Sequence, residues 1–117
     1  MISLEKARAL KEAGLKWDPC RGDWYFYISR RQFVKYTSEA DVIKSDPESD
    51  NYTFCPRLDQ LLGEIEKYTG CALYVFGNNK YEVEVVDTKE WNHHFKADTP
   101  EDAAADALLW LMGQEGK

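Results

Sequence analysis

An apolar residue recurs every three or four positions at the start of the chain. Leu4, Ala7 and Leu10 share one face of a helix that we predict over residues 3–13, with its serine as the N-terminal cap. Gly14 follows at the position where many helices end in a left-handed residue. The first element is therefore predicted as a short amphipathic helix.

Aromatic residues replace this helical spacing between residues 24 and 36. The run at 24–28 is apolar on both faces, which is typical of a strand covered on both sides, and 33–36 predicts its hairpin partner. The polar stretch at 37–53 offers little to bury. We expect it to be a mobile surface loop or to hold one short turn of helix at 39–43.

A second amphipathic helix is predicted after this stretch. Pro56 suits the first helical position, and Gly70 ends the pattern. The apolar residues of its buried face are Leu58, Leu61, Leu62, Ile65 and Tyr68.

Three strands are predicted next. Residues 72–76 are continuously apolar, so we expect this strand at the centre of its sheet. Residues 81–85 alternate, with valines facing inward and Glu82 and Glu84 facing solvent. Residues 91–95 are predicted as the last strand, and short links make the sheet antiparallel.

The final helix has the clearest local signals. Thr99 is placed as its N-terminal cap, Pro100 as its first residue, and Asp102 as the third residue of a shortened capping box. Its alanines allow a close approach to the sheet, and residues 113–117 are expected to fray. These alanines are Ala103, Ala104, Ala105 and Ala107.

The predicted order is thus α-β-β-α-β-β-β-α over a single domain, residues 1–117. The fold class is α+β, as a layered α/β/α sandwich with a mainly antiparallel sheet. Hydrophobic residues make up 44% of the chain and aromatic residues 14%, which is enough for a packed core.

Composition also limits the setting of the protein. There is no run of about 18 apolar residues that could span a membrane, and the first residues lack the apolar segment of a secretory signal. Cys20, Cys55 and Cys71 are odd in number and widely spaced, which favours reduced thiols over a disulfide framework. We therefore expect a cytoplasmic protein.

The formal net charge of −6 is unevenly distributed. Residues 1–56 carry nine basic and nine acidic side chains, whereas residues 57–117 carry six basic and twelve acidic ones. A surface of this sign repels nucleic-acid phosphates and suits a soluble protein or a basic partner.

Nucleic-acid binding nevertheless has one argument in its favour. A helix, three antiparallel strands and an alanine-rich helix are the order of a double-stranded RNA-binding domain. Such domains need lysines at the start of the last helix, where residues 99–102 here are Thr-Pro-Glu-Asp. A double-stranded RNA-binding-like domain is kept as the alternative reading.

No residue set predicts a metal or catalytic site. The three cysteines lack the paired spacing of zinc ligands, and His93 and His94 are neighbours in a strand, so they point to opposite faces. Glu82 and Glu84 could act as an acid–base pair, but strand alternation already explains them. We predict no catalytic, cofactor-binding or metal residues, and a small enzyme of unknown reaction is the second alternative.

Aromatic residues and arginines do predict a partner surface, because both are enriched in protein interfaces. The alternative is that the aromatic residues form the core of the sheet. The candidate residues are Trp17, Trp24, Tyr25, Tyr27, Arg30 and Arg31. The partner is then an unknown protein, with no nucleic acid and no membrane, and the chain is a monomer or a weak dimer.

Several segments together resemble a known family. They are the Lys-Glu-Ala-Gly helix end at 11–14, the aromatic strand, Cys-Pro-Arg-Leu-Asp-Gln-Leu-Leu at 55–62, and residues 95–111. The chain resembles small uncharacterised proteins of phages and prophages of Gram-positive bacteria, sometimes called the phage ABA sandwich domain. This resemblance implies an α/β/α sandwich and a cytoplasmic accessory protein of phage origin, without catalytic residues to carry over.

Overall fold

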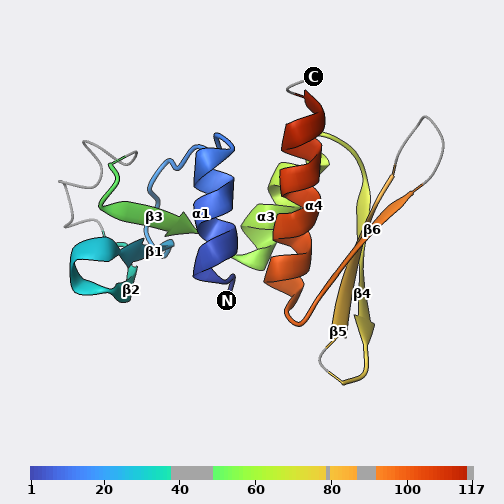
Figure 1. The fold of residues 1–117 in the computed structure, drawn as a ribbon, viewed down its shortest axis with the longest axis horizontal. Helices are drawn as coiled ribbons and strands as arrows, with labels where there is room; N and C mark the ends of the chain where they lie inside the picture. Colours follow the sequence, from blue (N-terminus) through green and yellow to red (C-terminus); the bar gives the residue numbers. More distant parts are fainter. Residues whose placement is uncertain (38–48, 79, 87–91, 116–117) are drawn as a thin grey trace.

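The computed structural model describes residues 1–37, 49–78, 80–86 and 92–115. These residues form three α-helices, one 3-10 helix and two three-stranded antiparallel sheets, which confirms the α+β class (Figure 1). The elements are α1 (Leu4–Glu12), β1 (Trp24–Tyr27), η1 (Ile28–Arg30), β2 (Gln32–Lys35), β3 (Tyr52–Cys55), α3 (Leu58–Glu66), β4 (Cys71–Phe76), β5 (Lys80–Val85), β6 (His93–Ala97) and α4 (Pro100–Glu115).

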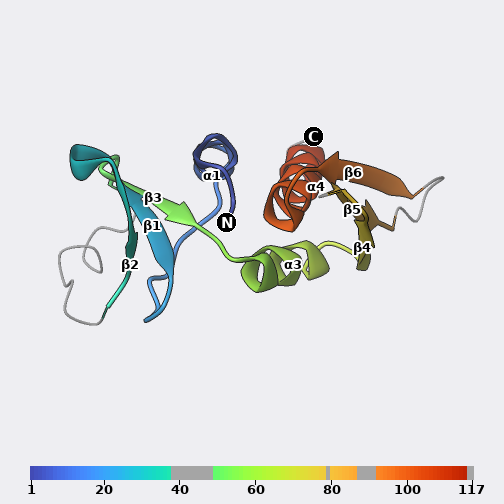
Figure 2. The same cartoon turned by 90° about the horizontal axis from the view of Figure 1, so that it is seen from below.

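Helices pack on sheets as predicted, but the strands are divided between two separate sheets. The strand orders are β2-β1-β3 and β4-β5-β6. Figure 2 shows the three helices between the two sheets, with α1 beside β3 and with α4 and α3 beside the second sheet. This arrangement follows from the added strand β3, which gives the first half of the chain a sheet of its own.

The ends of α1 match the sequence prediction. The Ser3 hydroxyl accepts a hydrogen bond from the Lys6 amide at 3.3 Å. At the other end Gly14 has a φ of 104°, and the Leu15 amide donates to the Leu10 carbonyl at 3.0 Å. This pair of features is a Schellman ending, so the helix stops where its glycine predicts.

The start of α4 also matches, with one difference. The Thr99 hydroxyl accepts from the Asp102 amide at 3.1 Å, as predicted. The Asp102 carboxylate, however, accepts from the Ser3 amide at 2.8 Å and thereby links the first turns of α4 and α1. The helix continues to Glu115, so residues 113–115 belong to it and are not a frayed tail.

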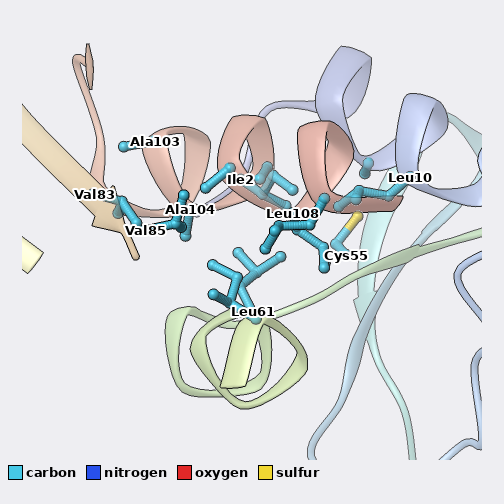
Figure 3. Packing of buried hydrophobic residues seen from close by; sticks show 14 residues of the cluster. Ile2, Leu10, Cys55, Leu61, Val83, Val85, Ala103, Ala104 and Leu108 are labelled. Atoms are coloured by element: carbon cyan, nitrogen blue, oxygen red, sulfur yellow. The ribbon is translucent and has the colours of Figure 1, made fainter. Parts of the chain in front are cut away.

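The main core lies where the three helices meet the two sheets. Leu10 of α1, Leu61 of α3, Val83 of β5 and Leu108 of α4 each have an exposed fraction of 0% and converge there (Figure 3). The four alanines predicted to allow close packing are also fully buried. Because these side chains are small, α4 packs against α1, α3 and the second sheet at once.

Some predicted boundaries were wrong. Residues 52–53, assigned to the loop, begin β3, because pairing with β1 supplies the hydrogen bonds that a polar flanking sequence does not reveal. α3 begins at Leu58 and leaves Pro56 outside the helix. The last strand starts at His93, two residues later than predicted. Trp91 and the possible turn at 39–43 lie outside the described residues.

The position predicted for the apolar strand at 72–76 was also wrong. β5 is the central strand of its sheet, and β4 is an edge strand. Tyr74, Val75 and Phe76 have exposed fractions of 43%, 70% and 49%. A continuous apolar run normally signals burial on both faces, but here the helices cover only the first half of the strand.

Candidate functional site

The predicted partner residues do not form one surface. Trp17 and Tyr25 are buried, with exposed fractions of 5% and 6%, in an aromatic cluster on one face of the first sheet. The Trp17 ring stacks on Phe54 at a centroid distance of 5.4 Å, and Tyr25 meets Tyr52 edge to face at 5.8 Å. These two residues therefore belong to a second core.

The remaining members lie at different places. Trp24 is half-buried and points to the opposite face of β1, toward the main core. Tyr27 is half-buried, with the guanidinium of Arg30 at 6.0 Å from its ring centroid. Arg30 and Arg31 are exposed. A partner surface at this corner stays a prediction, and it would rest on the two arginines and the edge of Tyr27.

A buried carboxylate joins the segment at residues 17–20 to the start of α3. Asp23 has an exposed fraction of 2%, and its Oδ2 accepts from the Trp17 indole and the Cys20 amide, each at 3.0 Å. Its Oδ1 accepts from the Arg57 guanidinium at 3.2 Å and the Gln60 amide group at 2.8 Å. With four donors around it, this carboxylate has a structural role, and a neighbouring hollow of about 340 Å³ opens beside it.

The cysteines lie apart from one another. Cys20 is exposed, Cys71 is half-buried, and Cys55 at the end of β3 is buried in the main core, where burial raises the pKa of its thiol to about 12. Such a thiol is a poor nucleophile. In the part of the chain that the structure describes, no group of three or more histidine, cysteine or acidic residues is arranged to hold a metal ion.

The outer face of the second sheet carries a group of ionisable residues in mutual contact. His94 lies between the two glutamates, with its Nδ1 at 3.4 Å from Glu82 and its Nε2 at 3.2 Å from Glu84. Lys96 lies at 3.8 Å from Glu82, and the Tyr74 hydroxyl donates to Glu84 at 3.1 Å. Strand register explains the group, because Glu82 is opposite Tyr74 and Lys96, and Glu84 is opposite His94.

This group is a set of paired charges on the sheet face that bears no helix. The prediction that both glutamates face solvent was wrong for Glu82, which has an exposed fraction of 8% because Tyr74, His94 and Lys96 surround it, whereas Glu84 is half-buried. The hydrogen bond to Glu84, and then the charge of that carboxylate, raise the pKa of Tyr74. A hollow of about 270 Å³ lies at one end of the face, but the two glutamates do not line it. His93 points to the other face, where its ring lies 4.2 Å from that of Trp110, which confirms that the two histidines do not share a site.

The start of α4 bears on the RNA-binding alternative. The order α3-β4-β5-β6-α4 matches that of a double-stranded RNA-binding domain. However, the first turn of α4 is occupied by the chain itself, since the amino terminus lies at 3.6 Å from Glu101 and Ser3 binds Asp102. Acidic side chains already bound by the N-terminal segment leave this helix end unsuited to a phosphate.

The edge of β4 differs from the other sheet edges. β2 carries Lys35, and β6 carries His94 and Lys96, whose charges discourage pairing with another strand. β3 is uncharged, but α1 packs against it, and the Lys11 ammonium donates to the Ser49 carbonyl at 2.6 Å and to the Tyr52 carbonyl.

β4 lacks these protections. It has six residues, none of them charged and none of them proline, and β5 pairs with one side of it while no described strand pairs with the other. Its last three residues form the largest group of neighbouring exposed apolar side chains in the described part of the chain. An exposed, uncharged edge of this length is a template for pairing with another chain. Sequence reasoning missed this site because the apolar run was placed at the sheet centre.

Comparison with known proteins gives no family assignment, because no family model, no curated protein and no solved structure matches the chain. Among the described residues, no helix combines the length and the apolar character needed to cross a membrane.

Proposed function

We propose that this chain is a non-enzymatic accessory protein of phage or prophage origin that acts in the cytoplasm of its host by binding another protein. The binding surface is the free edge of β4 with its exposed residues Tyr74, Val75 and Phe76. That edge is the observation that carries the proposal, because soluble proteins usually block such strands with charge, proline or a covering element.

The ionisable residues support binding over catalysis. On the outer face of the second sheet, each glutamate already has a partner within the chain, and the nearby hollow is not lined by either of them. Acid–base catalysis requires such groups to face a substrate in a cleft. The buried Asp23 is likewise fully engaged by its four donors.

Strand addition would combine main-chain hydrogen bonds with contacts to side chains on both faces of β4. Tyr74 and Phe76 project on the outer face of the sheet, and Val75 projects on the face that bears the helices. A partner would therefore need an extended segment with apolar residues at alternate positions.

The test is a comparison of baits in the host cell. The wild-type chain, Val75→Lys and the matched control Val86→Lys are each purified with their bound proteins at equal expression. Val86 is also an exposed valine, with an exposed fraction of 45%, and it directly follows β5. We expect a protein that is retained by the wild type and by the control and is lost with Val75→Lys, and the purified pair should then bind in vitro with the same ranking. Equal recovery by all three baits would show that the β4 edge is not the binding surface.

A further inference from the structure

We infer that the β4 edge binds the β4 edge of a second copy of this chain, with the two strands antiparallel about a twofold axis at Val75. This inference rests on the proposed function, because it uses the same edge, with a second copy of the chain in place of a different protein. Two properties of β4 support it: the exposure of its apolar residues 74–76 and its lack of charged residues.

The register is chosen by the exposed half of the strand. Exposure rises along β4, from half-buried residues at 71–73 to exposed ones at 74–76. With the twofold axis at Val75, this valine lies opposite the partner's Val75. Tyr74 then lies opposite the partner's Phe76, and Phe76 opposite the partner's Tyr74. Directly opposed aromatic residues are among the favourable cross-strand pairs, so the segment is complementary to itself.

Charge also permits this pairing. β4 has no charged residue, so no like charges lie opposite each other in the new strand pair. Within each copy Tyr74 is opposite Glu82, and Phe76 is opposite Lys80. Across the new sheet, Tyr74 and the partner's Phe76 would then lie between Glu82 and the partner's Lys80. These two flanking side chains have opposite charges.

The shape of the molecule leaves room for a second copy. Figure 1 shows the β4–β5 hairpin extending beyond the first turn of α4, and Figure 2 shows β4 on the outside of its sheet. A second hairpin could lie beside the first and form one sheet with the order β6-β5-β4-β4-β5-β6.

The exposed area predicts a weak dimer. From their exposed fractions, Tyr74, Val75 and Phe76 offer roughly 300 Å² of side-chain surface per copy. The two copies together would then bury roughly 600 Å² from these side chains, whereas stable complexes bury about 1,200–2,000 Å². We therefore expect a dimer dissociation constant Kd of about 10–1,000 μM. Each copy carries a formal charge of −6, so added salt should strengthen the dimer by screening the repulsion.

Sedimentation equilibrium of the full chain tests the inference. As its concentration rises to about 1 mM, the wild type should increase in average mass from 13.6 kDa toward twice that value. Val75→Lys should weaken the association at least about tenfold, because it places two ammonium groups opposite each other. Val86→Lys, which lies at the other end of the sheet, should change it less than about twofold. A wild type that stays monomeric over this range, or a Val75→Lys variant that associates as strongly, would overturn the inference.

Cysteine cross-linking tests the register. In a Cys20→Ser background, which removes the exposed native thiol, Val75→Cys places two thiols directly opposite each other. Opposed residues of antiparallel strands have Cα atoms about 4.5–5.5 Å apart, which is within the range for a disulfide. Val75→Cys should form disulfide-linked dimers on mild oxidation, and Val86→Cys should not. Equal cross-linking of the two variants would refute the register.

The two proposals can fail separately. If the wild type stays monomeric but a different protein is retained by the chain and lost with Val75→Lys, self-pairing is wrong and the proposed function holds. If neither self-association nor any protein dependent on Val75 is found, both proposals are wrong.

Discussion

The buried Asp23 carboxylate provides the sharpest test of how the two halves of this molecule are joined. Its four hydrogen bonds connect the Trp17–Cys20 turn to Arg57 and Gln60 at the start of α3. Asp23→Ala removes both acceptor oxygens and with them all four hydrogen bonds. The Trp17 indole then stays buried without its partner, whereas Arg57 can turn to solvent because its side chain is 41% exposed.

The expected magnitude follows from these partners. Leaving a buried donor unpaired costs about 1–3 kcal/mol, and removing one member of a buried ion pair costs about 3–5 kcal/mol. Because Arg57 regains water, we expect a total loss of about 3–4 kcal/mol of the free energy of unfolding. That is a large part of the about 5–15 kcal/mol that stabilises a typical domain. Asp23→Asn keeps the shape but turns an amide group toward two donors, so it should cost about 2–3 kcal/mol.

Urea unfolding followed by circular dichroism and tryptophan fluorescence measures these losses. With a slope of about 1–3 kcal/mol per molar urea, Asp23→Ala should lower the midpoint by roughly 1–4 M. The matched control is Asp59→Ala, which removes the exposed carboxylate at 3.1 Å from the same arginine and should cost about 0–1 kcal/mol. Losses below about 1 kcal/mol for both Asp23 variants, or equal losses for Asp23→Ala and Asp59→Ala, would refute the structural role of the buried carboxylate.

Three further predictions concern single residues elsewhere in the fold. Leu61→Ala should cost about 2–5 kcal/mol in the same urea assay, because this side chain is fully buried between α3 and α4, and a loss below about 1 kcal/mol would contradict that packing. With a thiol pKa of about 12, Cys55 should react with a disulfide reagent at pH 8 at least about a hundredfold more slowly than the exposed Cys20. The rapid phase of the reaction should therefore vanish in Cys20→Ser. Glu84→Gln should lower the pKa of Tyr74 toward its ordinary value, because the carboxylate that raises it is gone; an unchanged tyrosine titration by NMR would disprove that contact.

Local sequence signals predicted the helices well. The Ser3 cap, the glycine ending of α1 and the Thr99 cap each act through residues within one helical turn, so the sequence contains all the information that they need. The alternation of Val83 and Val85 with two glutamates likewise revealed which face of β5 meets the main core, although Glu82 on the other face is also buried. The second partner of Asp102 escaped prediction, because Ser3 lies 99 residues away in the chain. The start of α3 at Leu58 and the continuation of α4 to Glu115 also differed from the prediction.

Pairing partners were much harder to predict. β3 is preceded by a polar stretch and shows no alternation of its own, and it becomes a strand because β1 offers it hydrogen bonds. The aromatic residues of the first sheet were ambiguous between a surface and a core for the same reason. Trp17 reaches Phe54 only after the strands have paired.

The sequence by itself therefore determined the α+β class, the order of the predicted elements, both ends of α1 and the start of α4, since helix caps and side-chain periodicity are local properties. The tertiary structure alone decided which strands are central and which are edges. Both kinds of strand can have the same apolar sequence, because the difference lies in neighbours that are distant in the chain. For β4 that decision turned a predicted core strand into the exposed edge on which both proposals rest.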